Sequence, residues 1–405
     1  MIIPQTLKGF RDFLPEKMLK REAVLTKLEH VFKLFGFDPL ETPAIEYSET
    51  LLGKYGDEAD KLLYRFKDRG EREVGLRYDQ TVPFARVVSQ YKNELTFPFK
   101  RYQIQPVWRA EKPQKGRFRE FLQCDLDIAG SSSTLADAEI LLTSFNALKE
   151  LGFSDVQILI NDRTIFDKLN LSKKQIIILD KLEKIGVEKV ILELSELGTK
   201  DALMVLNDLR NASPTPRLLK IFNHLTDSGL TQNRDFIFQS TLARGLDYYT
   251  STIFEIKISN YSAGSVAGGG RYDNLMNQFI QEDVPSVGIA FGFDRIIEAM
   301  EENHLLMGNK TNTQVLISSL DNTSVSYSYK IADVLRKESI SCEIYLDPDV
   351  KLEKKIKFAD KKGIPYVVIL GSEEEKTNTV TLKTLKNRTQ IRIPIHELAR
   401  DLQDS

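Results

Sequence analysis

Apolar and polar residues alternate along two stretches in the first third of the chain. In the first stretch, Tyr102, Ile104, Pro106 and Trp108 alternate with Arg101, Gln103, Gln105 and Arg109, and in the second, Leu122, Cys124, Leu126 and Ile128 alternate with Phe121, Gln123, Asp125 and Asp127. Alternation with a period of two predicts β-strands that have one apolar and one polar face. We therefore predict a β-hairpin over residues 100–128 and expect the rest of the chain to be organised around it.

The segment between these two strands is strongly basic. Arg109, Lys112, Lys115, Arg117 and Arg119 stand there against a single acid, Glu111. Such a local positive field suits a polyanionic ligand. The alternative is an edge hairpin whose charges are only solvated.

The pattern outside the hairpin predicts several domains. Helical spacing over residues 16–34 and 135–151, with a strand at VQILIN, predicts an α+β domain formed by residues 1–162 and 236–303. The stretch FDPLETPAIEY is predicted as one short strand with prolines near an edge. Short Lys- and Leu-rich helices predict a helical insertion over residues 163–235. After a polar linker at 304–312, alternating strands and helices over 313–405 predict a small, mostly parallel α/β domain.

Composition limits the classes of function. The chain has 405 residues, 41% hydrophobic and 28% charged, with a net charge of −2. Nucleic-acid binding must therefore come from local basic patches. Cys124 and Cys342 lie far apart and the four histidines are scattered, so we expect neither a structural metal site nor a disulfide. Without a signal segment or an apolar run of membrane-spanning length, we expect a cytoplasmic protein with no membrane partner.

Three further stretches carry candidate chemistry. Asp79 and Thr81 precede a helix with an early proline, so Asp79 is either a helix cap or a carboxylate for a substrate ammonium. ARGLDYYTSTIFEI places Arg244 and two tyrosines on a turn before a strand, where a polar corner is the alternative. VGIAFGFDRI predicts a strand that enters a helix with Arg295 in its first turn, a suitable place for a phosphate.

Two weaker signals remain. The glycines of AGGGRYDNL allow close backbone approach, with Arg271 and Asp273 leading into a predicted helix, but they match neither a P-loop nor a dinucleotide fingerprint. The second helix of the C-terminal domain has a predicted basic surface that includes Lys354 and Lys355. Such lysines contact RNA or are simply solvated.

Taken together, these stretches resemble class II aminoacyl-tRNA synthetases, and specifically the histidyl-tRNA synthetase family. ETPAIE is similar to motif 1 of the class, VWRAEKPQKGRFREF to motif 2 and VGIAFGFDRI to motif 3. ARGLDYYTSTIFEI and AGGGRYDNL resemble the histidine-specific signatures. The resemblance implies a class II catalytic domain on an antiparallel sheet, an α/β anticodon-binding domain and a homodimer.

The resemblance also implies an ATP site. ATP with Mg²⁺ would lie over the sheet, with Arg109 on the α-phosphate, Arg295 on the γ-phosphate and Arg117 at the β/γ end. Glu111 would face the adenine. No metal ligand among the protein side chains is implied.

The histidine-binding residues that the resemblance implies are Asp79, Thr81, Gln123, Asp127, Arg244, Tyr248 and Tyr249. Arg244 and Arg109 would be catalytic, Arg244 by stabilising the charge that develops at the α-phosphate. Asp79 stands where many bacterial members of the family have Glu. The partner tRNA(His) would be contacted by Lys112, Gln114, Lys115, Lys354 and Lys355.

Two other functions are considered. A non-catalytic relative serves as the regulatory subunit of ATP phosphoribosyltransferase, but it generally lacks the anticodon-binding domain and degrades the RGLDYY stretch, and both are present here. Another class II synthetase, such as the threonyl or prolyl enzyme, would leave RGLDYY unexplained. The expected activity is the ATP-dependent joining of L-histidine to tRNA(His).

Overall fold

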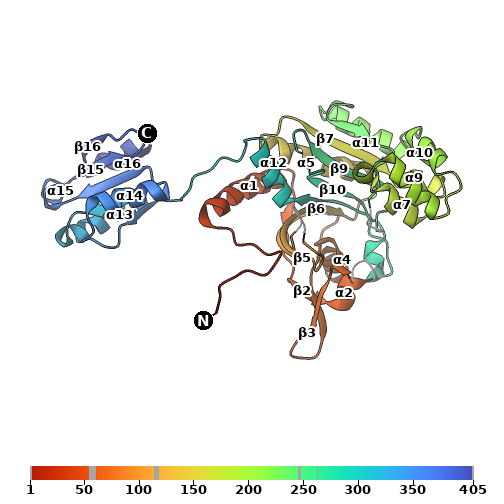
Figure 1. The fold of residues 1–405 in the computed structure, drawn as a ribbon, viewed down its shortest axis with the longest axis horizontal. Coiled ribbons are helices and arrows are strands. Elements are labelled where there is room, and N and C mark those ends of the chain that lie inside the picture. Colours follow the sequence, from red (N-terminus) through yellow and green to blue (C-terminus); the bar gives the residue numbers. More distant parts are fainter. Residues whose placement is uncertain (1, 54–60, 114–117, 245–247, 262, 404–405) are drawn as a thin grey trace. The chain divides into compact units, whose positions relative to one another are not determined.

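The computed structural model describes residues 2–53, 61–113, 118–244, 248–261 and 263–403. The chain forms two compact units, whose elements are shown in Figure 1. One consists of Met1–Asp12 with Val24–Leu306, and the other of Phe13–Ala23 with Met307–Ser405. Residues 303–314, which lie before the first strand of the C-terminal sheet, contain no helix or strand. The domain boundaries given above stay predictions.

An eight-stranded sheet forms the centre of the first unit. Its order is β1-β5-β6-β11-β10-β9-β7-β8, and neighbouring strands are antiparallel except for β1 with β5 and β7 with β8. The strands are β1 (Asp38–Pro39), β5 (Phe99–Trp108), β6 (Glu120–Ala129), β7 (Val156–Asp162), β8 (Phe236–Phe238), β9 (Thr252–Ile258), β10 (Ala267–Arg271) and β11 (Ser286–Gly292). The predicted α+β class with a large, mainly antiparallel sheet is confirmed.

β5 and β6 are the predicted hairpin, and they lie inside the sheet between β1 and β11. The alternative of an edge hairpin with solvated charges is therefore wrong. Even the polar face is buried: Arg101 and Gln103 are fully inaccessible, and Arg101 is paired in register with Asp127. Contacts with Phe84 and Thr42 show what covers this face, since the Arg101 Cζ lies 4.5 Å from the centre of the Phe84 ring and Gln103 Nε2 donates to Thr42 Oγ1.

The opposite, apolar face of the sheet carries the main core and its helices. These are α1 (Pro15–Leu34), α5 (Thr134–Glu150), α11 (Pro216–Asp227) and α12 (Phe293–Glu302). Leu28, Ile140, Phe222 and Ile296, one from each helix, belong to one buried cluster. α5 begins where the Ser133 hydroxyl accepts a hydrogen bond from the amide of Leu135 at 3.2 Å, as expected of an N-cap serine.

The region predicted as a helical insertion contains short helices. They are α6 (Thr164–Lys168), α7 (Lys173–Leu179), α8 (Leu182–Ile185), α9 (Val187–Glu196), α10 (Ala202–Arg210) and α11. Phe166, Leu179, Leu194 and Leu206 lie in a second buried cluster, whereas the apolar side of α11 belongs to the main core. The last helix of the region is thus part of the sheet's own packing.

A three-stranded antiparallel sheet stands beside the large one. It comprises β2 (Ile45–Tyr47), β4 (Glu73–Leu76) and β3 (Tyr64–Lys67), in the order β2-β4-β3, with α2 (Ser48–Leu52) and α4 (Thr81–Gln90) nearby. The single strand predicted for FDPLETPAIEY is wrong, because β1 and β2 belong to different sheets. The stretch between them is held by Arg77, whose Nη1 donates to the carbonyl of Thr42 at 2.6 Å and that of Pro43 at 3.2 Å.

The sheet of the second unit has the order β13-β12-β14-β15-β16. Its strands are β12 (Val315–Ser319), β13 (Cys342–Ile344), β14 (Tyr366–Leu370), β15 (Thr379–Thr384) and β16 (Gln390–Pro394), and its helices are α13 (Val325–Lys337), α14 (Leu352–Lys362), α15 (Ser372–Thr377) and α16 (Ile395–Gln403). β13, β12 and β14 are parallel, but β14, β15 and β16 are antiparallel. The prediction of a mostly parallel sheet is corrected to a mixed one.

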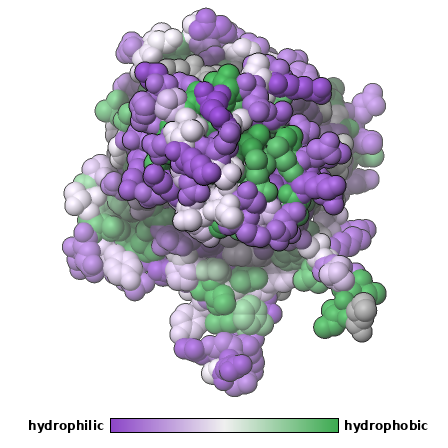
Figure 2. Space-filling view, turned by 90° about the vertical axis from the view of Figure 1, so that its left-hand side faces the viewer, coloured by the Kyte–Doolittle hydropathy of each residue, from purple (hydrophilic) through white to green (hydrophobic). Residues whose placement is uncertain are grey.

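The surface drawn in Figure 2 is mainly hydrophilic, and its apolar side chains form small separate groups. Within the described ranges, none of the helices has the length and apolar character required to cross a bilayer.

Candidate active site

A cavity of about 290 Å³ adjoins β6, β10, β11 and the start of α12. Six residues assigned from the sequence line it together: Arg109, Glu111, Lys112, Gln123, Arg244 and Arg295. Much of the remaining lining is small or aromatic, including Gly268, Gly292, Phe118 and Phe121. Such a lining leaves room for a flat ring and for an anionic chain beside it.

Three arginines bring positive charge to this cavity from different elements. Arg109, just after β5, donates through Nε to the carbonyl of Tyr78 at 3.1 Å. Arg295, in the first turn of α12, donates through Nη1 to the carbonyl of Ser265 at 2.8 Å. Arg244 forms an ion pair with Glu255, 2.8 Å from Nη1 to Oε1. The carbonyl partners fix two guanidinium groups without neutralising them, which favours a polyanionic ligand.

Three carboxyl groups lie buried beside the cavity. Asp79 Oδ1 accepts a hydrogen bond from the amide of Val82 at 3.2 Å, so its side chain caps the first turn of α4 although Gln80 holds the N-cap position. Burial raises the pKa of Asp79 to about 6, against the opposing effects of the Val82 amide and Arg109. Burial also raises the pKa of Asp127 and raises that of Asp125 well above its usual range. Buried carboxyl groups with raised pKa values are candidate partners for a cationic or hydrogen-bonding ligand.

Arg101 balances this acidic group and was missed as a site residue. Its Nη2 lies 2.7 Å from Asp127 Oδ2, and its Nη1 donates to Gln103 Oε1 at 3.1 Å. The Tyr272 hydroxyl donates to Asp127 Oδ1 from the other side. The alternation placed Arg101 on the polar face of its strand, and that signal could have found it. Tyr272 and Glu255 stand in AGGGRYDNL and ARGLDYYTSTIFEI, but neither stretch showed which side chains they contact.

The tyrosines of the RGLDYY stretch form an aromatic group. The ring centres of Tyr248 and Tyr249 are 4.7 Å apart, and those of Tyr248 and Tyr272 are 5.9 Å apart. Tyr249 is buried in the cluster formed by helices α6 to α10, and the Arg244 Cζ lies 5.8 Å from its ring centre. Residues 245–247 lie outside the described residues. The helical region therefore takes part in positioning Tyr249.

Glycines on β10 and β11 allow these side chains to approach the sheet. A Cβ at Gly268 would lie 2.0 Å from Arg244 Nη1, and one at Gly288 would lie 1.8 Å from Asp127 Oδ1. A Cβ at Gly270 would lie 2.7 Å from the Tyr249 ring. The glycine cluster is therefore explained by packing against site residues and not by phosphate binding.

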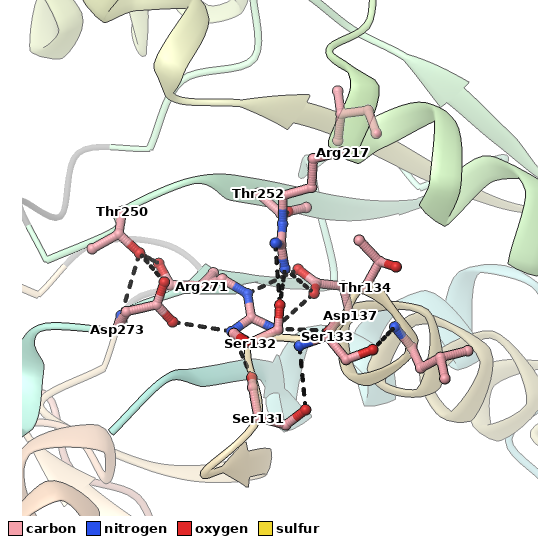
Figure 3. Close-up of polar contacts among 12 residues, drawn as sticks. Ser131, Ser132, Ser133, Thr134, Asp137, Arg217, Thr250, Thr252, Arg271 and Asp273 are labelled. Carbon is pink, nitrogen blue, oxygen red and sulfur yellow. Dashed lines mark hydrogen bonds and ion pairs between the residues drawn. The ribbon is translucent and has the colours of Figure 1, made fainter. Parts of the chain in front are cut away.

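Arg271 and Asp273 of the same stretch belong to a buried ionic network shown in Figure 3. Arg271 ends β10, and the helix predicted to follow Asp273 is a short 3₁₀ helix, η1 (Leu275–Gln278). Its Nη2 and Nε bind the two oxygens of Asp137 at 2.7 and 3.3 Å, and its Nη1 lies 3.0 Å from Asp273 Oδ1. Arg217 of α11 also pairs with Asp137, at 2.7 Å. This network ties β10 to the start of α5 and to α11.

The other predicted residues fall in several places. Thr81 is the first residue of α4 and is half-buried. Gln114, Lys115 and Arg117 lie outside the described residues. In the second unit Lys354 is exposed, but Lys355 is buried, and its Nζ donates to the carbonyls of Ser319 at 2.7 Å and Pro348 at 2.9 Å. The prediction that Lys355 contacts tRNA is corrected, because its ammonium group is held inside the unit.

Comparison with known proteins covers both units. The family model for histidyl-tRNA synthetase matches residues 9–296, and that for an anticodon binding domain matches residues 314–405. The histidine–tRNA ligase of Cytophaga hutchinsonii is 40% identical over 451 residues, covering 98% of this chain and 99% of the relative. That of Christiangramia forsetii is 38% identical and covers 99% of each. The histidyl-tRNA synthetase structure from Nostoc sp. PCC 7120 covers 100% of both chains at 30% identity, with a TM-score of 0.86.

Relatives matched along nearly their whole length carry the ligase name, which favours a catalytic synthetase over the regulatory-subunit alternative. The chain belongs to the histidyl-tRNA synthetase family.

Proposed function

We propose that the cavity beside β6, β10 and β11 activates L-histidine with ATP and then passes the histidyl group to tRNA(His). The observation that carries this proposal is the meeting of Arg109, Arg244 and Arg295 at one cavity that adjoins buried carboxyl groups. One part of such a site suits a triphosphate and the other suits an amino acid.

ATP is assigned to the arginine-lined part. Arg109 is proposed on the α-phosphate and Arg295, at the N-terminus of α12, on the γ-phosphate, because a guanidinium and a helix N-terminus both favour phosphate. Arg117 is proposed at the β/γ end and Glu111 at the adenine. The lining ring of Phe121 offers a flat apolar surface for a base.

Histidine is assigned to the acidic part. Asp79, Thr81 and Gln123 are proposed to bind its ammonium group. A bound ammonium would favour ionised Asp79, whose pKa of about 6 in the empty site leaves it easily deprotonated at neutral pH.

Side-chain selection is assigned to Asp127 and the two tyrosines, Tyr248 and Tyr249. One carboxyl acceptor and one hydroxyl on opposite sides of the imidazole would read both ring nitrogens. Arg101 and Tyr272 hold the Asp127 carboxyl in place. An apolar side chain of similar size would leave these buried groups without hydrogen bonds, and would be rejected.

The first step is attack of the histidine carboxylate on the α-phosphorus of ATP. A carboxylate oxygen–phosphorus bond forms, and the bond to the bridging oxygen of pyrophosphate breaks, so that pyrophosphate leaves. No protein base is needed, because the carboxylate is already ionised. Arg244, fixed by Glu255, is proposed to stabilise the charge that develops on the α-phosphate, with Arg109 beside it.

The second step transfers the histidyl group. A ribose hydroxyl at the 3′ end of tRNA attacks the adenylate carbonyl, and AMP leaves. Lys112, Gln114 and Lys115 of the hairpin loop are proposed to approach the acceptor end. The C-terminal unit, with Lys354 on α14, is proposed to bind the anticodon.

Mg²⁺ is proposed to enter with ATP and to neutralise charge on the departing pyrophosphate when it is bound. The described residues contain no group of three or more potential metal-ligating side chains. Mg²⁺ in nucleotide sites is generally bound through substrate phosphates and water, together with one or two carboxylates.

A homodimer in the cytoplasm is proposed as the working form. Ile45 and Tyr47 on β2 and Phe66 on β3 are 48%, 50% and 42% exposed. They stand on one small sheet, and Ile45 belongs to the motif 1 stretch ETPAIE. An apolar surface of this kind suits burial against a second copy.

The experiment that tests this function is the exchange of labelled pyrophosphate into ATP without tRNA, with each of the twenty amino acids supplied separately. Exchange supported by histidine alone would establish adenylate chemistry and its specificity. Absence of exchange in a protein that still binds histidine would contradict the proposal and favour a regulatory role.

A further inference from the structure

The N-terminal segment, residues 8–12, touches the proposed ATP site through one side chain. The Nη2 of Arg11 lies 2.8 Å from Oδ2 of Asp294, and its Cζ lies 3.2 Å from the centre of the Phe118 ring. Asp294 and Phe118 both line the cavity, whereas Arg11 does not. Arg11 therefore contacts two elements that line the pocket, although it does not line the pocket itself. These are the end of the hairpin loop, at Phe118, and the first turn of α12, at Asp294.

Main-chain contacts hold this segment in place. The amide of Arg119 donates to the carbonyl of Gly9 at 2.9 Å, next to the pocket residue Phe118. Gly9 has a φ of +93°, and a Cβ there would lie 2.9 Å from Arg119 Cγ. The position of the segment beside the loop is thus built into its backbone, and does not depend on Arg11 alone.

The charges of the pair matter because of where Asp294 stands. It precedes Arg295, which is proposed to bind the γ-phosphate, and it lines the same cavity. The side chains of Arg11 and Asp294 are only 26% and 13% exposed, so solvent screens their charges incompletely. Removal of Arg11 would take a positive charge away from Asp294, and the carboxylate would then repel a bound triphosphate more strongly.

We propose that Arg11 is a positioning residue of the ATP pocket, which neutralises Asp294 in the first turn of α12 and stacks on the Phe118 ring at the end of the hairpin loop. This inference rests on the proposed use of ATP. It gives the N-terminal segment a role in nucleotide affinity and none in histidine recognition, since neither Asp294 nor Phe118 is among the histidine-binding residues.

The test compares Arg11→Met, Arg11→Lys, Asp294→Asn and the double variant Arg11→Met/Asp294→Asn in histidine-dependent pyrophosphate exchange. Arg11→Met should raise KM for ATP about tenfold and change KM for histidine by less than about twofold. KM for ATP in Arg11→Lys should lie between the values for wild type and Arg11→Met, because lysine keeps the charge but loses the planar stack on Phe118. The double variant should recover most of the ATP affinity, because an amide at 294 does not repel phosphate.

The control is Arg234→Met, which breaks an arginine–aspartate pair of similar length, 2.7 Å to Asp235, away from the cavity. An unchanged KM for ATP in Arg11→Met would overturn the inference. So would equal increases in both KM values with a lowered melting temperature, or a double variant no better than Arg11→Met. If the wild-type protein fails to catalyse exchange, calorimetric binding of ATP decides instead, and equal affinity of wild type and Arg11→Met would overturn the inference.

Discussion

Arg244 is held at the pocket by one acidic partner, Glu255, and that arrangement defines a test of its proposed role. Arg244→Ala should lower the rate of adenylate formation by about three orders of magnitude, because the cation beside the α-phosphate is lost, while histidine binding changes less. Arg244→Lys should be intermediate, since it keeps the charge and loses the fork. Single-turnover formation of adenylate measures this step directly.

The matched control also removes the charge of Glu255, the ion-pair partner of Arg244. In Arg244→Ala, Glu255 loses its 2.8 Å partner and becomes an uncompensated carboxylate near the site. Arg244→Ala/Glu255→Gln removes both charges, and it should remain as slow as the single variant. Near-normal turnover in either protein would reject the catalytic role of Arg244.

Asp79 offers a pH-dependent test. Its pKa is about 6 in the folded chain against 3.8 for the ordinary group, so the folded chain binds this proton more tightly than the unfolded chain. Ionised Asp79 therefore destabilises the fold increasingly as pH rises from about 4 to about 6, and fully above that. Asp79→Asn should be more stable than wild type by at most roughly 2 to 3 kcal/mol above pH 6 and by little near pH 4.

Urea unfolding at pH 4.5 and pH 7.5 checks this expectation, because asparagine keeps an oxygen for the Val82 amide and only the ionisation is removed. A stability difference that is the same at both pH values would contradict it. The same variant should lose histidine affinity, because the ionised carboxylate that destabilises the fold is also the group proposed to bind the ammonium of histidine.

Residue type, spacing and the family resemblance predicted several of the residues that line the candidate cavity. Alternation placed Gln123 and Asp127 on one polar face, and the family resemblance selected Arg109, Arg244 and Arg295. The burial of Lys355 could not be predicted from the sequence. Helical spacing does not show which lysine of α14 points into the unit and donates to main-chain carbonyl groups. Tyr272 was missed because its partner Asp127 is 145 residues away, and Glu255 because nothing in its strand pattern indicated that it pairs with Arg244, 11 residues earlier.

At the scale of elements, the glycines of β10 and β11 set how closely site residues approach the sheet. Gly288→Ala should raise KM for histidine more than about tenfold, because its Cβ would lie 1.8 Å from Asp127 Oδ1 and must displace that carboxyl. Gly70→Ala is the control, since a Cβ in that turn stays 3.3 Å from its nearest neighbour. Steady-state exchange kinetics would show the difference, and equal behaviour of the two variants would refute it.

Elements with a strong local pattern were predictable, and those set by distant pairing were not. The β5–β6 hairpin and helices α1, α5 and α12 follow from period and end signals. The division between β1 and β2 depends on two different sheets, and the antiparallel β16 depends on β15. A strand's neighbours are chosen by the whole fold, which no window of sequence contains.

At the scale of the whole molecule, adenylate chemistry and tRNA binding are assigned to different units. The cavity and its buried charges lie in the first unit, and the exposed lysines of α14 lie in the second. Changes on α14 should therefore affect tRNA charging and leave pyrophosphate exchange intact. Because Lys354 is exposed and Lys355 is buried, substitution of Lys354 tests RNA contact and substitution of Lys355 tests stability.

Lys354→Glu/Lys357→Glu reverses two exposed charges and should raise KM for tRNA at least about tenfold in aminoacylation, with a weaker dependence of binding on salt. Lys355→Met should instead destabilise the second unit by about 1 to 3 kcal/mol, because the carbonyl groups of the buried Ser319 and the half-buried Pro348 lose their donor. Lys376→Glu, beside Glu373 and Glu375 on α15, controls for reversal of a lysine outside a basic surface. Equal losses in charging and in pyrophosphate exchange would show misfolding, and would contradict the assignment of tRNA binding to α14.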